Sequence, residues 1–182
     1  MNNSELETLI RNILREQLVP ATPRTQRNAI FQTVDEAVCA AHQAFLRFQQ
    51  CPLKTRSAII SAIREELMPR LTELAEESAK ETGMGNKEDK YLKNKAALDN
   101  TPGIEDLTTT ALTGDGGMVL FEYSPFGVIG SVTPSTNPTE TIINNSISML
   151  AAGNSVYFSP HPGAKNVLFK TDYHNRRHRV SL

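Results

Sequence analysis

The first apolar residues of the chain recur at the spacing of one helical face and stop before a proline. They are Leu6, Leu9, Ile10, Ile13, Leu14 and Leu18. This spacing places them on one stripe of an α-helix, and Ser4 and Glu7 have the spacing of a capping box at its start. The pattern predicts an amphipathic helix over residues 1–18 and a polar, proline-containing linker over residues 19–29.

A short helix on a tether has no nearby partner for its apolar stripe, and it is costly to nucleate in water. Such a helix can dock on its own domain or in a groove on another protein. The linker favours the second hypothesis, in which residues 1–18 are a recognition helix.

From residue 30 onward the apolar spacing predicts a mainly helical region. Thr33 and Glu36 form a second capping box, while Pro52 and Pro69 are expected to separate successive helices. Gly83 is expected to end the third of these helices, and a charged helix follows over residues 87–98. The residues predicted to face inward are Val34, Ala37, Val38, Ala41, Phe45, Phe48, Ile59, Ile60, Ile63, Leu67, Leu71, Leu74, Ala75 and Ala79.

The pattern changes at residue 114, where a glycine-rich turn precedes short apolar runs. Residues 118–123 predict a strand, and residues 128–132 and 155–158 have the length and composition of buried parallel strands. Residues 139–152, between them, have helical spacing. Strand, helix and strand make one βαβ unit, so the predicted fold class is α/β, with a helical N-terminal region and an incomplete sheet.

Composition and charge narrow the class of protein. The 182 residues carry a net charge of −1, so no overall field favours nucleic acid or an anionic membrane. No apolar run is long enough to span a bilayer, and no cleavable signal is visible. Cys39 and Cys51 are not surrounded by residues at metal-ligand spacing and are expected to be reduced thiols of a cytoplasmic protein. We therefore expect no metal site, no nucleic-acid partner and no membrane partner.

Two loops follow the predicted parallel strands, at the edge where open parallel sheets bind ligands. The first, residues 133–138, carries hydroxyl and amide side chains and leads into a helix N-terminus, which favours negative charge or an oxyanion. In the second, residues 159–162, His161 stands between two prolines and is expected to be exposed rather than catalytic. No GxGxxG fingerprint is present. The residues alone indicate part of a nucleotide-binding domain without a nucleophile.

Several segments resemble one family. ETGMG (residues 81–85), PFGVIGSVTPSTNP (residues 125–138) and AAGNSVYFSPHP (residues 151–162) look like the CoA-acylating branch of the aldehyde dehydrogenase superfamily. Within it they are similar to the enzymes of bacterial propanediol and ethanolamine utilisation, and the first helix most resembles that of the propionaldehyde-oxidising members. The resemblance runs from residue 1 to about residue 165. It implies that residues 30–165 are the N-terminal part of an aldehyde-dehydrogenase-type Rossmann domain.

The resemblance implies an oxidoreductase that converts propionaldehyde, CoA and NAD⁺ into propionyl-CoA and NADH, with a cysteine as nucleophile. Thr136 stands where hydrolytic members carry the asparagine that donates to the oxyanion, and Asn137 follows it, so both are candidates. Hydrolytic members also have a lysine, a contact to the adenosine ribose, where Ser159 stands. The residues that the resemblance places beside the NAD cofactor are Val132, Thr133, Pro134, Ser135, Ser159, Pro160 and His161.

In the same group the first helix is an encapsulation peptide that binds a shell protein of a bacterial microcompartment. This implies shell-docking roles for Glu7, Ile10 and Leu14, and a location in the microcompartment lumen within the cytoplasm. Full-length family members oligomerise. Two alternatives stay open, namely an acylating acetaldehyde dehydrogenase of ethanolamine utilisation and a non-catalytic fragment that keeps only the docking helix.

Residues 166–182 match nothing in the resemblance, are rich in Arg and His, and have little apolar periodicity. The nucleophilic cysteine is expected beyond residue 182, so the chain alone is predicted to be catalytically incomplete. A shifted reading frame over residues 168–182 can encode the expected continuation of a helix. We therefore hypothesise a frameshift, which requires an intact family sequence downstream in another frame of the gene.

Overall fold

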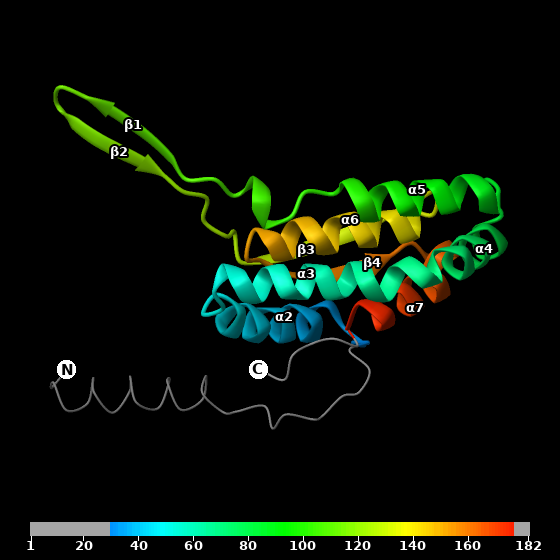
Figure 1. The fold of residues 1–182 in the computed structure, drawn as a ribbon. Helices are drawn as coiled ribbons and strands as arrows, with labels where there is room; N and C mark the ends of the chain where they lie inside the picture. The colour runs from blue at the N-terminus through cyan, green and yellow to red at the C-terminus, as the bar shows by residue number, and fades with distance from the viewer. Residues whose placement is uncertain (1–29, 177–182) are drawn as a thin grey trace, which may run out of the picture. The chain divides into compact units, whose positions relative to one another are not determined.

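The structure is a computed structural model that describes residues 30–176, with side chains described as far as Thr171. The predicted N-terminal helix and linker, including Glu7, Ile10 and Leu14, lie outside the described residues. Helices form the first half of the described chain (Figure 1). In chain order they are α2 (Val34–Phe48), α3 (Leu53–Leu67), the 3₁₀ turn η1 (Met68–Arg70), α4 (Leu71–Thr82) and α5 (Lys87–Asn100).

The ends of these helices follow the local signals in the sequence. Helix α2 begins at Thr33, whose hydroxyl accepts a hydrogen bond from the backbone N–H of Glu36 at 3.2 Å. The Glu36 carboxylate accepts in turn from the backbone N–H of Gln32 at 3.1 Å, so it reaches one residue further back than in an ordinary capping box. Gly83 ends α4 in the left-handed conformation, with φ +65°, as predicted.

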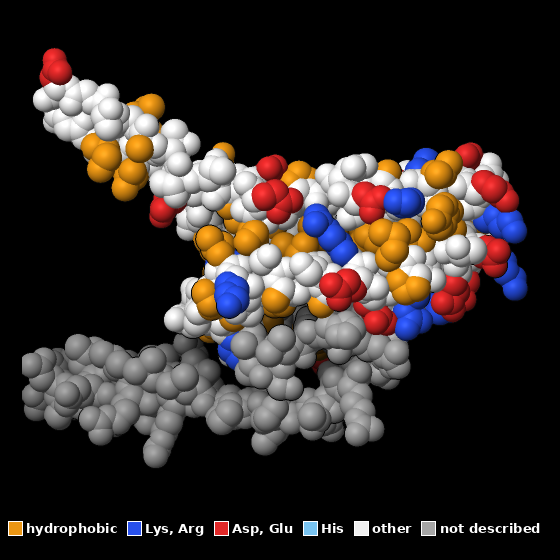
Figure 2. Space-filling view, viewed as in Figure 1, with side chains coloured by type: hydrophobic (Ala, Val, Ile, Leu, Met, Phe, Trp, Pro, Cys, Tyr) orange, Lys and Arg blue, Asp and Glu red, His pale blue; other side chains and the backbone are white. Residues whose placement is uncertain are grey.

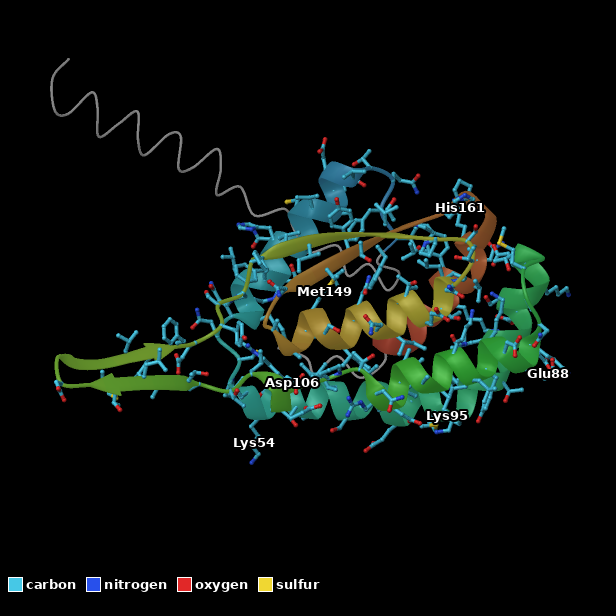
Figure 3. All side chains as sticks on the ribbon, turned by 90° about the horizontal axis from the view of Figure 1, so that it is seen from above. Lys54, Glu88, Lys95, Asp106, Met149 and His161 are labelled. Atoms are coloured by element: carbon cyan, nitrogen blue, oxygen red, sulfur yellow. The ribbon has the colours of Figure 1, made fainter. Side chains whose placement is uncertain are left out.

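The second half of the chain contains the predicted βαβ unit. Strand β3 (Val128–Thr133) leads through α6 (Pro138–Ala151) to β4 (Ser155–Pro160). The two strands are parallel, and Val128 pairs with Ser155. Helix α2 packs against both strands from one side and α6 packs against both from the other (Figure 3). The α/β fold class is therefore confirmed.

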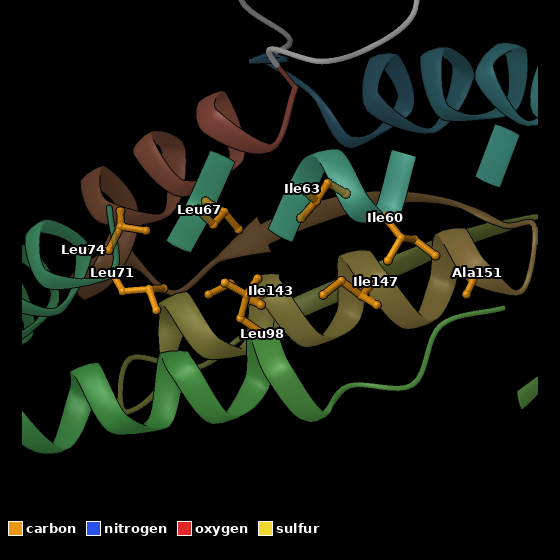
Figure 4. Packing of buried hydrophobic residues seen from close by; sticks show 9 residues of the cluster. All are labelled: Ile60, Ile63, Leu67, Leu71, Leu74, Leu98, Ile143, Ile147 and Ala151. Carbon is orange, nitrogen blue, oxygen red and sulfur yellow. The ribbon is translucent and has the colours of Figure 1, made fainter. Parts of the chain in front are cut away.

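The main core lies where α3, α4, α5 and α6 meet (Figure 4). Its buried residues are Ile60, Ile63, Leu67, Leu71, Leu74, Leu98, Ile143, Ile147 and Ala151. Helices α3, α4 and α6 each direct apolar side chains inward, and α5 adds Leu98, so the cluster stabilises the helices and the βαβ unit together.

The helices α2–α7 and the strands β3 and β4 pack together and form the body of the structure. A β-hairpin extends away from this body (Figure 1). The 3₁₀ turn η2 (Ile104–Asp106) precedes β1 (Thr110–Gly114), which pairs antiparallel with β2 (Gly117–Phe121). Every residue of both strands is exposed, and apolar side chains gather along the hairpin (Figure 2). The sequence predicted the second strand and the turn but not β1, because its residues TALTG have few apolar positions.

Two expectations about burial are wrong. On α2, Val34 and Val38 are exposed, although both were predicted to face inward. The stripe on this helix is wider than a two-stranded sheet can cover, so only Ala37, Ala41 and Phe48 are buried. Strand β3 was predicted to be buried, yet Val132 is 82% exposed. It lies on the side of the sheet opposite α6, and α2 on that side does not cover this end of β3.

The chain after β4 is helical, which corrects the expectation that residues from 166 onward lack apolar periodicity. The 3₁₀ turn η3 (Pro162–Ala164) leads into α7 (Lys165–Arg176), which packs against α3, α4 and α6. Buried residues stand at helical spacing here, namely Ala164 at the end of η3 and Val167, Leu168 and Thr171 in α7. Carboxylates of α4 also hold this helix, since Glu81 accepts from the first amides of α7 and Lys170 pairs with Glu73 and Glu77.

Candidate functional site

The carboxyl ends of β3 and β4 bring the two predicted loops together. Thr133 pairs with Pro160 at the end of the parallel register. The backbone N–H of His161 donates to the carbonyl of Thr133 at 3.1 Å. The first loop, residues 133–138, and the second loop, residues 159–162, therefore lie side by side, as expected for parallel strands.

The residues at this edge differ in exposure, because successive residues of a strand face opposite ways. Val132, Pro134 and Ser159 are exposed, whereas Thr133 is only 1% exposed. The hydroxyl of Thr133 is buried without a hydrogen-bond partner among the described residues. An unpaired buried hydroxyl is costly, and this one is enclosed by the protein rather than open to a ligand.

The remaining residues of the two loops are held by local contacts. The Ser135 hydroxyl lies 3.9 Å from the Met84 sulfur, and Pro160 is half-buried. The His161 imidazole is exposed, and its Nδ1 accepts from the backbone N–H of Gly163 at 3.1 Å (Figure 3). This contact caps the 3₁₀ turn η3.

The oxyanion candidates stand directly before α6. Thr136 is exposed and Asn137 is half-buried. Asn137 occupies the N-cap position of α6, yet its side chain makes no capping hydrogen bond. Its backbone carbonyl instead accepts from the hydroxyl of Thr141 at 2.7 Å. The amide side chain of Asn137 is thus not used to cap its own helix.

Helix α5 supplies contacts to this loop that sequence reasoning missed. Lys90 donates through Nζ to the carbonyl of Thr136 at 2.9 Å, and Lys93 donates through Nζ to Oδ1 of Asn137 at 3.2 Å. Asn94 lies next along the same face and accepts at Oδ1 from the hydroxyl of Thr139 at 2.6 Å. The spacing of these three α5 residues, at i, i+3 and i+4, indicates only that they share one face of the helix, not what that face contacts.

The charges around the loop affect one another. Lys90 is only 5% exposed, and this burial lowers its pKa, which the carboxylate of Glu140 partly offsets and the charge of Lys93 lowers further. Burial raises the pKa of Glu140, against the opposing effect of Lys93 and Lys90. A buried lysine costs free energy unless it is paired. Losing the hydrogen bond from Lys90 to the carbonyl of Thr136 would therefore be costly, and this bond holds the loop in place.

No nucleophile lies in this arrangement. Cys39 is exposed on α2, and Cys51 is buried just before α3. Within residues 30–176 no group of His, Cys, Asp and Glu could hold a metal ion. The helices of the described part also include none long and apolar enough to cross a membrane.

A parallel βαβ unit with a polar loop at the carboxyl ends of its strands is the arrangement at which open α/β domains bind their ligands. The chain belongs to the aldehyde dehydrogenase family, whose sequence profile matches residues 21–171. This confirms the family that the sequence motifs indicated.

Curated relatives indicate which members of the family this chain is most similar to among those compared. The CoA-propanoylating propanal dehydrogenase of Citrobacter freundii is 83% identical over 170 residues, which are 93% of this chain and 37% of that enzyme. The acetylating acetaldehyde dehydrogenase of Escherichia coli K12 is 44% identical over 169 residues, which are 92% of this chain and 36% of that enzyme. The chain therefore spans a little over a third of the curated relatives that it matches.

Solved structures agree in fold. The propionaldehyde dehydrogenase of Rhodopseudomonas palustris, with bound CoA and an acylated cysteine, has a TM-score of 0.79 and 49% identity, covering 81% of this chain and 34% of that one. An engineered glycolyl-CoA reductase with bound NADP⁺ has a TM-score of 0.78 and 49% identity, with coverage of 81% and 34%. A propionaldehyde dehydrogenase from the fucose utilisation microcompartment of Clostridium phytofermentans has a TM-score of 0.78 and 44% identity, with coverage of 82% and 34%.

Proposed function

We propose that this chain is part of an NAD-dependent, CoA-acylating propionaldehyde dehydrogenase. The reaction is propionaldehyde + CoA + NAD⁺ → propionyl-CoA + NADH + H⁺. The observation that carries the proposal is the polar loop at the carboxyl edge of the βαβ unit, in a chain 83% identical to a CoA-propanoylating enzyme. The lower identity of 44% to an acetylating enzyme makes acetaldehyde the second candidate substrate.

The loop residues fit a bound nucleotide cofactor. Val132 offers an exposed apolar surface at this edge, and Thr133 beside it ends the strand at the point where the two loops meet. Pro134, Ser135, Ser159, Pro160 and His161 would line the same edge. Bound NAD⁺ would supply the hydride acceptor, and CoA would accept the acyl group.

The chain's own contribution to the chemistry is to orient the substrate and to stabilise negative charge. When a thiolate adds to an aldehyde carbonyl, the carbonyl oxygen becomes an oxyanion, and donors aimed at that position lower the barrier. Asn137 and Thr136 are the candidate donors, at the N-terminal end of α6, where the helix dipole favours negative charge. The thiolate itself comes from a part of the enzyme other than the residues at this site.

A hybrid enzyme tests the proposed activity. Residues 1–171 of this chain would be joined to the remaining part of the Citrobacter freundii relative, and NADH formation would be followed with propionaldehyde and CoA. We expect turnover that needs both substrates and is faster with propionaldehyde than with acetaldehyde. One methylene is worth about 1–3 kcal/mol. The 182-residue chain alone should show no turnover, because the site has no nucleophile. A hybrid that is inactive while the parent relative is active would refute the proposal.

We propose in addition that residues 1–18 bind a shell protein and direct the enzyme into a bacterial microcompartment, with Glu7, Ile10 and Leu14 on the binding stripe. The amphipathic spacing supports this hypothesis. A fluorescent reporter fused to residues 1–18 should enter microcompartments, and Ile10→Asp or Leu14→Asp should abolish entry, because a buried carboxylate costs several kcal/mol. Asn12→Asp, which adds the same charge to the polar face, is the matched control and should still enter. Entry by all variants alike would contradict the proposal.

A further inference from the structure

Helix α5 holds the loop before α6 at three successive positions. The contacts run from Lys90 to the carbonyl of Thr136, from Lys93 to Oδ1 of Asn137, and from the hydroxyl of Thr139 to Asn94. The two lysines are the donors to the two oxyanion candidates themselves. The loop is therefore set by a neighbouring helix and not only by its own turn.

The contact from Lys93 determines which end of the Asn137 amide is available. A lysine ammonium donates hydrogen bonds and accepts none, so only the amide oxygen can face it. Nδ2 of Asn137 then points away from Lys93 and makes no hydrogen bond to the described residues. An oxyanion needs a donor, and the amide NH₂ is the donor end of this side chain. If the amide were turned round, its oxygen would repel the developing charge.

The contact from Lys90 acts on Thr136. The backbone carbonyl oxygen of Thr136 accepts a hydrogen bond from Nζ of the buried Lys90 at 2.9 Å. Both loop oxygens that would oppose an oxyanion are thus bound by lysines.

We propose that Lys93 is a positioning residue, which turns the amide of Asn137 so that its NH₂ group donates to the oxyanion, while Lys90 anchors the loop. The inference rests on the proposed dehydrogenase function and deepens it, because it selects Asn137 over Thr136 as the oxyanion donor.

The side-chain amide of Asn137 reports directly on this contact. In the 182-residue chain labelled with ¹⁵N-asparagine, the heteronuclear NOE of the Asn137 Nδ2 group should match that of ordered backbone amides. Lys93→Met should lower it to the value of a freely rotating side chain, and Lys93→Arg, which keeps a cationic donor, should restore it. The control is Lys95→Met, since Lys95 lies on the same helix but pairs with Asp99. An unchanged NOE in Lys93→Met would overturn the proposal.

Kinetics of the hybrid enzyme give the second measurement. Lys93→Met should lower kcat about tenfold and leave KM for NAD⁺ unchanged, with most of the rate restored by Lys93→Arg. Asn137→Ala should lower kcat at least as much, and Lys93→Met should then have no further effect, because it acts through Asn137. Thr136→Val should change kcat less than twofold. An active hybrid whose kcat is insensitive to Lys93→Met, or more sensitive to Thr136→Val than to Asn137→Ala, overturns the inference. An inactive hybrid refutes the proposed function instead, and the NOE then decides the orientation of the amide.

Discussion

The helical body and the β1–β2 hairpin use the same kinds of apolar residue with opposite results. Leu71 and Ile147 in the body are 0% exposed, whereas Leu112 and Leu120 in the hairpin are 58% and 57% exposed. The hairpin is held by its own strand pairing, and such a ribbon is marginally stable when isolated. The comparison shows that a segment can form regular backbone hydrogen bonds without burying its apolar side chains. We expect the stability of the fold to depend mainly on the buried side chains.

The largest expected effect is in the body. Leu71→Ala should lower the free energy of unfolding by about 2–5 kcal/mol, because it leaves a cavity among fully buried side chains. Leu112→Ala in the hairpin removes the same atoms from an exposed position and should change it by less than about 0.5 kcal/mol. Urea unfolding followed by far-UV circular dichroism measures both. Similar losses for the two variants would break the comparison.

The next largest effect is expected at Glu81 of α4, which binds the first turn of α7. The two carboxylate oxygens of Glu81 accept from the backbone N–H groups of Asn166 and Val167, at 2.9 Å and 2.7 Å. Glu81→Ala removes both acceptors from a helix N-terminus and should cost about 1–2 kcal/mol. Glu81→Gln keeps one acceptor oxygen and should cost less.

Amide hydrogen exchange at Asn166 and Val167, together with the urea midpoint, measures this effect. Faster exchange at the two amides with a lowered midpoint is the expected result for Glu81→Ala. Exchange that is unchanged in this variant would mean that Glu81 does not hold the first turn of α7.

A smaller effect is the dependence of stability on pH. Burial raises the pKa of Glu140 from its ordinary value near 4.5, so the folded state binds that proton more tightly than the unfolded state. The protonated carboxyl therefore contributes stability at pH below 4.5, and this contribution is lost as pH rises through the folded-state pKa. Glu140→Gln should remove this part of the pH dependence. Urea unfolding of both proteins between pH 4 and pH 7 measures it, and parallel curves would contradict the assignment.

The smallest effect is expected from replacing the hairpin. A short Gly-Ser loop in place of residues 110–121 should leave the free energy of unfolding within about 0.5 kcal/mol of the parent's value, since the hairpin strands contribute nothing to the buried core. The same change removes an exposed apolar surface and should raise solubility. A large loss of stability would show that the hairpin supports the body after all.

Much of the fold was predictable because its signals are local. Thr33 and Gly83 mark helix ends through hydrogen bonds and backbone conformation within a few residues. Pro69 separates α3 from α4 because proline lacks a backbone N–H. Glycine turns and apolar runs likewise located the strands and helix of the βαβ unit.

The candidate site was predictable only in part. The carboxyl ends of parallel strands meet at one edge, so the two loops could be placed side by side from the sequence. The role of α5 could not, because Lys90 and Thr136 are 46 positions apart. A charged helix usually faces solvent, so the sequence of α5 did not indicate a contact. Packing of α5 against α6 brings the face with Lys90 and Lys93 next to the loop.

By itself, then, the sequence determined the helices, their caps, the βαβ unit and the family motifs, since each depends on interactions within a few residues or on spacing along one element. Only the tertiary structure decided which apolar residues are buried, as for Val38 and Val132, and which lysines reach the loop, as for Lys90 and Lys93. The physical reason is that burial and long-range hydrogen bonds depend on which surfaces the folded chain brings together, and distant residues meet only when the elements pack.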